Sequence, residues 1–302
     1  MPKKKKKKGP SLGPIAAGLA PAALALLLSQ AVLEPGPGEA PEVAGYGVVQ
    51  CDAVESMEDC HSRYPTGCTN SSTPYDPYLN LLKNQLMPTP AASVDFLGAE
   101  DFQRLDLSWP GGLEKKNHEQ FAQQLKDLGE GETFGIEGFL YDFKKTEKET
   151  SNCQIEDEQG DTEGTNVDYH IWVGFDEALA EVIRSGKKLT PSQKRKTRTG
   201  GYIVEMTPHY RATFAEDVWT LSNLRKARGR RVRVVGQLLA DNEHNIPSQN
   251  CAIAKTAGQK KLCWRASAWE LHPVTQLLVC AKADQSCGDS PADWVDLDQV
   301  SP

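Results

Sequence analysis

The sequence predicts a mainly β protein whose core is a closed five-stranded barrel. Between residues 134 and 280 the predicted elements run strand, strand, strand, helix, strand, strand. The strands share one continuous apolar face, as strands that enclose a core do. The composition, 39% hydrophobic and 25% charged, is that of a globular chain with room for one domain of about 150 residues plus attachments. This element order is that of the OB-fold, a five-stranded Greek-key barrel, here with a helix between strands 3 and 4.

Each strand is predicted from the alternation of apolar and polar residues. In the second strand, Tyr169 and Ile171 share one face, whereas Asp168, His170 and Trp172 share the other. The third strand alternates in the same way. The predicted strands are residues 134–141, 167–173, 202–209, 231–240 and 268–279.

Helices are predicted from capping residues and apolar stripes. The clearest one lies between strands 3 and 4, where Thr213 and Glu216 fit a capping box and Gly229 is a C-terminal stop. Its apolar stripe comprises Phe214, Val218, Leu221 and Leu224. Shorter helices are predicted at residues 117–128 and 175–184.

The N-terminus carries an export signal rather than part of the barrel. A basic block, Lys3 to Lys8, precedes an apolar stretch at residues 15–33, which is the pattern of a secretory signal with cleavage after Ala31. An uncleaved anchor is the alternative, since this stretch nearly spans a bilayer. In both cases the lysines direct the rest of the chain outward, to the periplasm or the extracellular space. The membrane is therefore expected to touch the protein only through this segment.

The chain divides into five predicted segments. These are a signal peptide or membrane anchor at 1–33, a Pro/Gly/Ser-rich linker at 34–75, an extended segment and short helix packing on the barrel at 76–129, the OB-like barrel at 130–282, and a loose acidic tail at 283–302.

Eight cysteines agree with export, because an even number in an exported chain usually forms disulfides. The connectivity stays open among 105 pairings. The easiest local pairs are Cys251 with Cys263 and Cys280 with Cys287. A zinc site made by the cysteines is disfavoured, because the chain has no C-x-x-C pair.

Polar residues of four strands gather on the face that points away from the core. They are Asp168, His170, Glu205, Thr207, His209, Arg233, Gln237, Glu270 and His272. In an OB-fold the exposed face around strands 2 and 3 is the usual ligand surface. Such a cluster could hold a metal, perform acid–base work, or simply lock the strands together through a hydrogen-bonded network.

The large aromatic residues divide between core and surface. Trp269 alternates with Leu271 and is expected in the core. Trp172 shares the polar face and is a candidate stacking platform for a ligand. The alternative is that the helix at residues 175–184 covers Trp172.

Positive charge is concentrated in the barrel although the whole chain carries −7. Between Val167 and Arg265 there are 18 Lys and Arg against 9 Asp and Glu. One basic run, around Arg195, lies between strands 2 and 3, and a second, from Arg225 to Arg233 with Arg230 between them, leads into strand 4. Basic loops beside an OB face suit a polyanion. The alternative is that the first run is a solvated loop and the second complements a helix C-terminus.

Four segments resemble a group of uncharacterised exported bacterial OB-fold-like domains. They are Asp168-Tyr169-His170-Ile171, Val204-Glu205-Met206-Thr207-Pro208-His209, Val232-Arg233-Val234-Val235-Gly236 and Trp269-Glu270-Leu271-His272-Pro273-Val274-Thr275, the last a W-E-x-H-P-V signature. The resemblance covers roughly residues 76 to 280. It implies a fold and an exported address, and it implies that the acidic and histidine residues of the polar face belong together. It implies no activity.

The leading hypothesis is a non-catalytic binding module of the cell envelope or extracellular space for an anionic polymer such as single-stranded nucleic acid or polysaccharide. Common catalytic motifs are absent from the sequence, and no cofactor is expected. The predicted ligand contacts are Asp168, His170, Trp172, Arg195, Glu205, Arg230, Arg233, Glu270 and His272.

Two alternatives remain. In a metal-dependent hydrolase, such as a nuclease, His170, Glu205 and His272 would hold a divalent metal, and Asp168 or Glu270 would activate water. The third hypothesis is a structural envelope protein whose barrel packs on a protein partner.

Overall fold

The computed structural model describes Leu79, Leu82, Lys83 and residues 94–115, 117–147, 160–215 and 217–301. The predicted signal or anchor and the linker lie outside these residues. Each of the four cysteines within the described residues is in a disulfide, Cys251 with Cys263 and Cys280 with Cys287, as the local pairing predicts.

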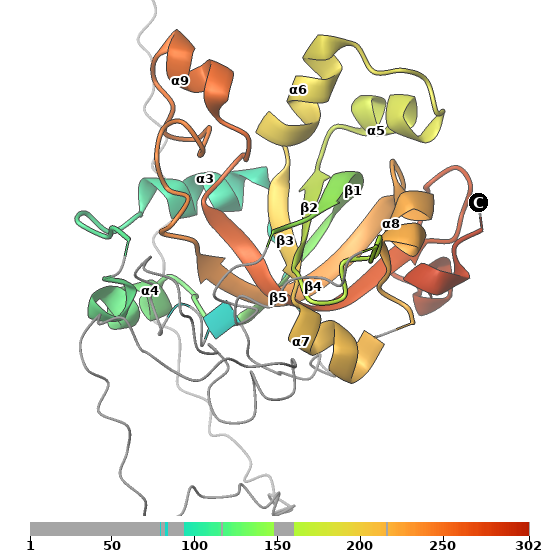
Figure 1. Ribbon diagram of the computed structural model, residues 1–302, viewed down its shortest axis with the longest axis horizontal. Coiled ribbons are helices and arrows are strands. Elements are labelled where there is room, and N and C mark those ends of the chain that lie inside the picture. The colour runs from blue at the N-terminus through green and yellow to red at the C-terminus, as the bar shows by residue number, and fades with distance from the viewer. Residues whose placement is uncertain are drawn as a thin grey trace, which may run out of the picture. The chain divides into compact units, whose positions relative to one another are not determined.

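Five strands close into the predicted OB-like barrel (Figure 1). They are β1 (Thr133–Lys145), β2 (Tyr169–Gly174), β3 (Tyr202–Met206), β4 (Arg231–Ala240) and β5 (Trp269–Cys280). The hydrogen-bonded order is β3-β2-β1-β4-β5, and a parallel contact of β3 with β5 closes the barrel. The mainly β barrel predicted from the element order is therefore confirmed.

The barrel interior is filled by the apolar face of each strand. Ile171 and Val173 of β2, Val204 of β3, Val234 of β4 and Leu271 of β5 all belong to the main buried cluster. Because side chains alternate along a strand, the residues between them point away from this core. The strand parity predicted from the sequence is correct.

Closure of the barrel depends on very little backbone pairing. The other neighbouring strands of the barrel pair through at least five residue positions, whereas β3 and β5 are matched only at Val204 and Leu271. The side chains next to this position therefore carry much of the contact between β3 and β5.

Two helices between β2 and β3 lie beside the barrel. They are α5 (Glu177–Arg184) and α6 (Pro191–Thr199). The sequence prediction had α5 but treated the segment of α6 as a loop. The helix α6 forms because Thr190 and Gln193 make a capping box and Pro191 occupies its first turn. Figure 1 shows α5, α6 and α9 (Ala257–Leu262), a helix of the β4–β5 loop, at the same end of the barrel.

The connection between β3 and β4 differs from the single capped helix that was predicted. It contains α7 (Pro208–Tyr210), the π-helical turn η3 (Arg211–Ala215) and α8 (Leu221–Ala227). Thr220, not Thr213, caps α8 by accepting a hydrogen bond from Asn223 N. Phe214 of the predicted stripe is 56% exposed, because η3 is a separate turn and not part of α8.

Before β1 lie α3 (Ala99–Leu107), η1 (His118–Phe121) and α4 (Ala122–Asp127). The helix α3 replaces part of the segment predicted to be extended. Its first turn is held by Asp101, whose carboxylate accepts the Gly98 N–H, and Phe102 is buried in the main core. None of the helices formed by the described residues combines the length and the apolar character needed to cross a membrane.

The C-terminal tail is folded on the barrel, not loose as expected. After η4 (Pro291–Asp293), β6 (Trp294–Asp296) pairs with β5, and η5 (Leu297–Gln299) follows. Leu297 and Val300 are buried in the main core. These two apolar residues, together with the pairing of β6, attach the tail to the barrel.

Candidate functional site

The polar residues predicted to share one face do lie together, outside the barrel core. His170 Nε2 is 2.7 Å from Glu205 Oε1, and His272 Nδ1 is 3.2 Å from Glu205 Oε2. The same His272 nitrogen is 3.1 Å from Glu270 Oε1. Strand order places these side chains side by side, because β2 and β5 are the two neighbours of β3. Glu205 therefore lies between two histidines.

This face is not the open ligand surface that was expected. Asp168, Glu270 and His272 are fully buried, Glu205 is 2% exposed and His170 is 7% exposed. The reason is that segments outside the barrel strands fold over the face. The alternation of apolar and polar residues along a strand carries no information about these covering segments. It therefore predicts the direction in which a side chain points but not its exposure.

The segment that follows α9 contributes part of this covering. Arg265 is completely buried, and its guanidinium forms ion pairs with Glu270 and with Asp241 Oδ2, the latter at 2.5 Å. Asp241 in turn lies 2.6 Å from His244 Nδ1. The network thus runs from His170 through the barrel face to His244, whose side chain is 27% exposed.

The charge state of this network follows from its pairing. Burial alone would raise the pKa of Asp241, but His244, Lys83 and Arg265 outweigh burial and hold this pKa well below its usual value. Burial and the charge of Asp241 both raise the pKa of Glu270, but Arg265 and His272 lower it by more, so this pKa is below its usual value. Both carboxylates are therefore ionised at neutral pH, and Arg265 is their shared counter-charge.

One part of the network has the composition of a metal site. Asp168, Glu205 and His272 each offer one ligand atom, and these three atoms lie within 4.8 Å of one another. The metal alternative predicted from the sequence used His170 instead of Asp168. The structure brings Asp168, directly before β2, into the group. His170 contacts Glu205 Oε1, whereas His272 contacts Glu205 Oε2.

Trp172 is covered and cannot act as an open stacking platform. It packs in a separate apolar cluster with Leu179 and Ile183 of α5, and its Nε1–H donates to Trp264 O at 3.0 Å. The alternative interpretation, that this helix covers Trp172, is confirmed. Trp269 lies in the main core as predicted.

The predicted basic contacts fall into two different environments. Arg195 is exposed on α6, and its Nη1 donates to Lys261 O in α9 at 2.8 Å. Arg230 donates to Ser301 O in the tail. Arg233 pairs with Glu137 at 2.6 Å and with Asp289 at 2.9 Å. Arg230 and Arg233 of the second basic run therefore help to attach the C-terminal tail, whereas Arg195 of the first run remains on the surface.

Sequence reasoning assigned no role to Arg265, Asp241 or His118, which are all buried. His118 Nε2 lies 2.9 Å from Glu130 Oε1, and this carboxylate oxygen also accepts the Ala240 N–H at 2.9 Å. One signal was present for Asp241, since it directly follows an apolar strand and is three residues before His244. Arg265 gives no such signal, because Asp241 is 24 residues away in the chain and no periodic pattern links Arg265 to Glu270, five residues further on.

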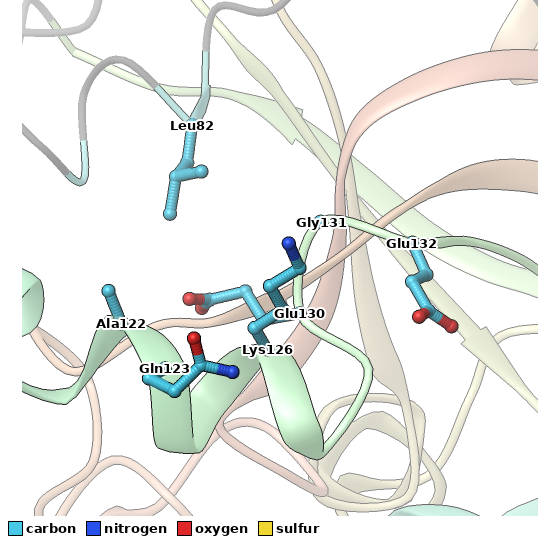
Figure 2. Close-up of a pocket in the computed structure, with 7 residues that line it drawn as sticks. All are labelled: Leu82, Ala122, Gln123, Lys126, Glu130, Gly131 and Glu132. Carbon is cyan, nitrogen blue, oxygen red and sulfur yellow. The ribbon is translucent and has the colours of Figure 1, made fainter.

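The structure also has a hollow of about 420 Å³ beside α4. Figure 2 shows Leu82 on one side of it and Ala122, Gln123 and Lys126 of α4 on the other. Glu130 belongs to its lining, but its carboxylate is already bound by His118 and the Ala240 N–H. The hollow is separate from the Glu205 network.

Comparison of the chain with protein-family models, with curated proteins and with solved structures gave no match. The resemblance to exported OB-fold-like domains therefore stays a prediction from the sequence segments.

Proposed function

We propose that this protein is a non-catalytic binding module for an anionic polymer, and that it binds through a basic surface on α6 and α9. The observation that supports this proposal most strongly is that two segments without any Asp or Glu, residues 185–201 and 251–265, meet at this surface. The contact between Arg195 and Lys261 O joins the two helices. Besides Lys196, which pairs with Asp176, the exposed cations on these two helices are Lys194, Arg195, Lys260 and Lys261.

The position of this surface differs from that of the strand face proposed from the sequence. Lys196 pairs with Asp176, and Arg198 lies over Trp172 and near Asp142, so the inner side of α6 contacts its own domain. The outer side offers cations to a partner. A row of exposed cations favours phosphate or sulfate groups, and the attraction is sensitive to salt.

We also propose that the domain acts after export, as the resemblance implies. The two disulfides support this address, because such bonds persist mainly in oxidising compartments. A single-stranded nucleic acid or an acidic polysaccharide outside the cell is then the ligand class. The hydrolase alternative is weaker, because the side chains that would hold its metal are almost completely buried and a substrate could not reach them directly.

The test is fluorescence anisotropy of a labelled single-stranded oligonucleotide with the full chain. Four phosphate contacts would weaken binding roughly 50-fold between about 50 and 200 mM salt. The variant Lys194→Glu/Lys260→Glu should weaken binding by at least about tenfold at the lower salt, since two attractive charges become repulsive.

The matched control is Lys115→Glu/Lys126→Glu, which makes the same change of net charge at two exposed lysines near α4. Both double variants contain Lys3 to Lys8, so any contribution of these lysines to binding is the same in the two proteins. Equal binding by both double variants would contradict the proposed surface. A heparin-type polysaccharide as a second probe distinguishes the two ligand classes.

A further inference from the structure

The buried network has the features of a divalent metal site, which is independent of the proposed polymer binding. Its three ligand atoms come from separate parts of the barrel wall, Asp168 directly before β2, Glu205 in β3 and His272 in β5. Imidazole and carboxylate are the ligands that Zn²⁺ and Mn²⁺ accept in proteins. Around an ion with bonds of about 2.1 Å, tetrahedral ligand atoms are roughly 3.4 Å apart. The present spacing of at most 4.8 Å must contract, so the three side chains rotate toward one another when an ion binds.

The histidine gives an independent reason to expect a ligand. His272 is fully buried, and its Nδ1 lies close to carboxylate oxygens of Glu270 and Glu205, whereas its Nε2 has no hydrogen-bond partner among the residues that the structure describes. A buried imidazole nitrogen without a partner is costly whether it carries a proton or a lone pair. A cation bound at this nitrogen would satisfy it.

The surroundings of His272 are those of a metal ligand. Histidines that bind metals usually donate their other ring N–H to a carboxylate, which orients the ring and raises its basicity. Glu270 occupies this position at 3.1 Å, and Arg265 holds Glu270 through a buried ion pair. Glu270 thus orients the imidazole through Nδ1, which leaves Nε2 for the ion. Glu205, whose Oε2 lies 3.2 Å from Nδ1, would turn toward the Nε2 side to share that ion.

We propose that Asp168, Glu205 and His272 bind one divalent transition metal ion, with Zn²⁺ as the representative, and that this ion fastens β3 to β5. The ligands Glu205 and His272 directly follow Val204 and Leu271, which form the one backbone position where these strands pair. An ion shared by Glu205 and His272 would strengthen the contact between β3 and β5, the neighbouring barrel strands with the fewest paired positions. Its role is structural, because the ligands are buried.

The experiment measures Zn²⁺ binding by the full chain after treatment with a chelator, by competition with a chromophoric chelator. Wild-type protein should bind one Zn²⁺ that Asp168→Asn and Glu205→Gln each weaken by at least about 100-fold, since each variant loses a charged ligand of the same shape. Glu130→Gln is the matched control, because Glu130 is also a buried carboxylate bonded to a histidine. It should change the affinity by less than about twofold, because it touches no proposed ligand.

Absence of Zn²⁺ binding to the wild type, or equal affinities of all four proteins, would overturn the proposal. Should both ligand variants fail to fold, the absorption of wild-type protein loaded with Co²⁺ decides. Weak visible bands without a near-ultraviolet thiolate band support the nitrogen and oxygen ligand set. A thiolate band would place the ion at cysteines, and absence of visible bands would mean that no ordered site exists; both results overturn the proposal.

Discussion

His272 Nδ1 lies 3.2 Å from Glu205 Oε2, immediately beside the single backbone position at which β3 and β5 pair. The barrel is therefore closed as much by side chains as by backbone hydrogen bonds. Glu205 also contacts His170 of β2 at 2.7 Å, so one buried carboxylate connects three strands. Loss of this carboxylate should affect the fold more than its small size suggests.

Replacing Glu205 by Leu should lower the free energy of unfolding by about 3–5 kcal/mol, since both histidines would lose a buried partner. Urea unfolding followed by circular dichroism measures this change. The control is Arg104→Ala, which removes an ion pair with Asp101 at a guanidinium side chain that is 70% exposed. Such a surface pair contributes at most about 1 kcal/mol. Similar losses in the two variants would show that the Glu205 network does not hold the barrel closed.

The cysteine pair Cys251–Cys263 should stabilise the protein through the segment that buries Arg265. Closing a loop of this length removes roughly 3 kcal/mol of entropy from the unfolded chain. We expect Cys251→Ser/Cys263→Ser to lose about that much stability in thermal melts. Because residues 250 and 265 also pair as a β-bridge, the fold itself should remain. An unchanged melting temperature would mean that the packing of Arg265 alone orders this segment.

The barrel could be predicted because the sequence features that indicate it lie close together in the chain. Alternation of apolar and polar residues gives each strand and its inward face, and short sequence separations favour the two observed disulfides. The grouping of Glu205, Glu270 and His272 followed from parity alone. These features need no knowledge of how distant segments pack.

The burial of the site could not be predicted, since it depends on contacts between distant segments. Arg265 meets Asp241 across 24 residues, and no periodic pattern marks that meeting. By contrast, the sequence contains a clear signal for α6. Thr190, Pro191 and Gln193 are typical of a helix start, although the basic residues after them favour a solvated loop.

Asp106 of α3 should make the stability depend on pH. Burial raises the pKa of its carboxyl from 3.8 to about 6, although Ser267 and Asn250 donate hydrogen bonds that lower it. A raised pKa means that folding favours the protonated acid. This contribution is complete below pH 3.8, the usual value, and is lost as the pH rises through about 6.

Asp106→Asn should therefore gain stability relative to wild type as the pH rises from about 4 to 8, by at most about 3 kcal/mol, because one pKa unit corresponds to about 1.4 kcal/mol. Unfolding in urea at several pH values measures this difference. Asp127→Asn, at an exposed position of α4, is the control for removing a carboxylate. A constant difference between Asp106→Asn and wild type across this range would contradict the prediction.

His244 should carry a proton at a pH where a free histidine has lost it. Burial would lower the pKa of His244, but the charge and hydrogen bond of Asp241 outweigh burial and raise it above 6.5. The folded-state pKa is then above the unfolded value, so this pair stabilises the protein below pH 6.5 and ceases to do so as the pH rises through the folded pKa. Two-dimensional NMR of the histidine ring protons against pH measures the titration. In Asp241→Asn the midpoint of His244 should fall, because the attraction disappears while Arg265 remains, whereas Glu130→Gln should leave it unchanged. A His244 midpoint at or below 6.5 in the wild type would show that burial prevails over the carboxylate at this end of the network.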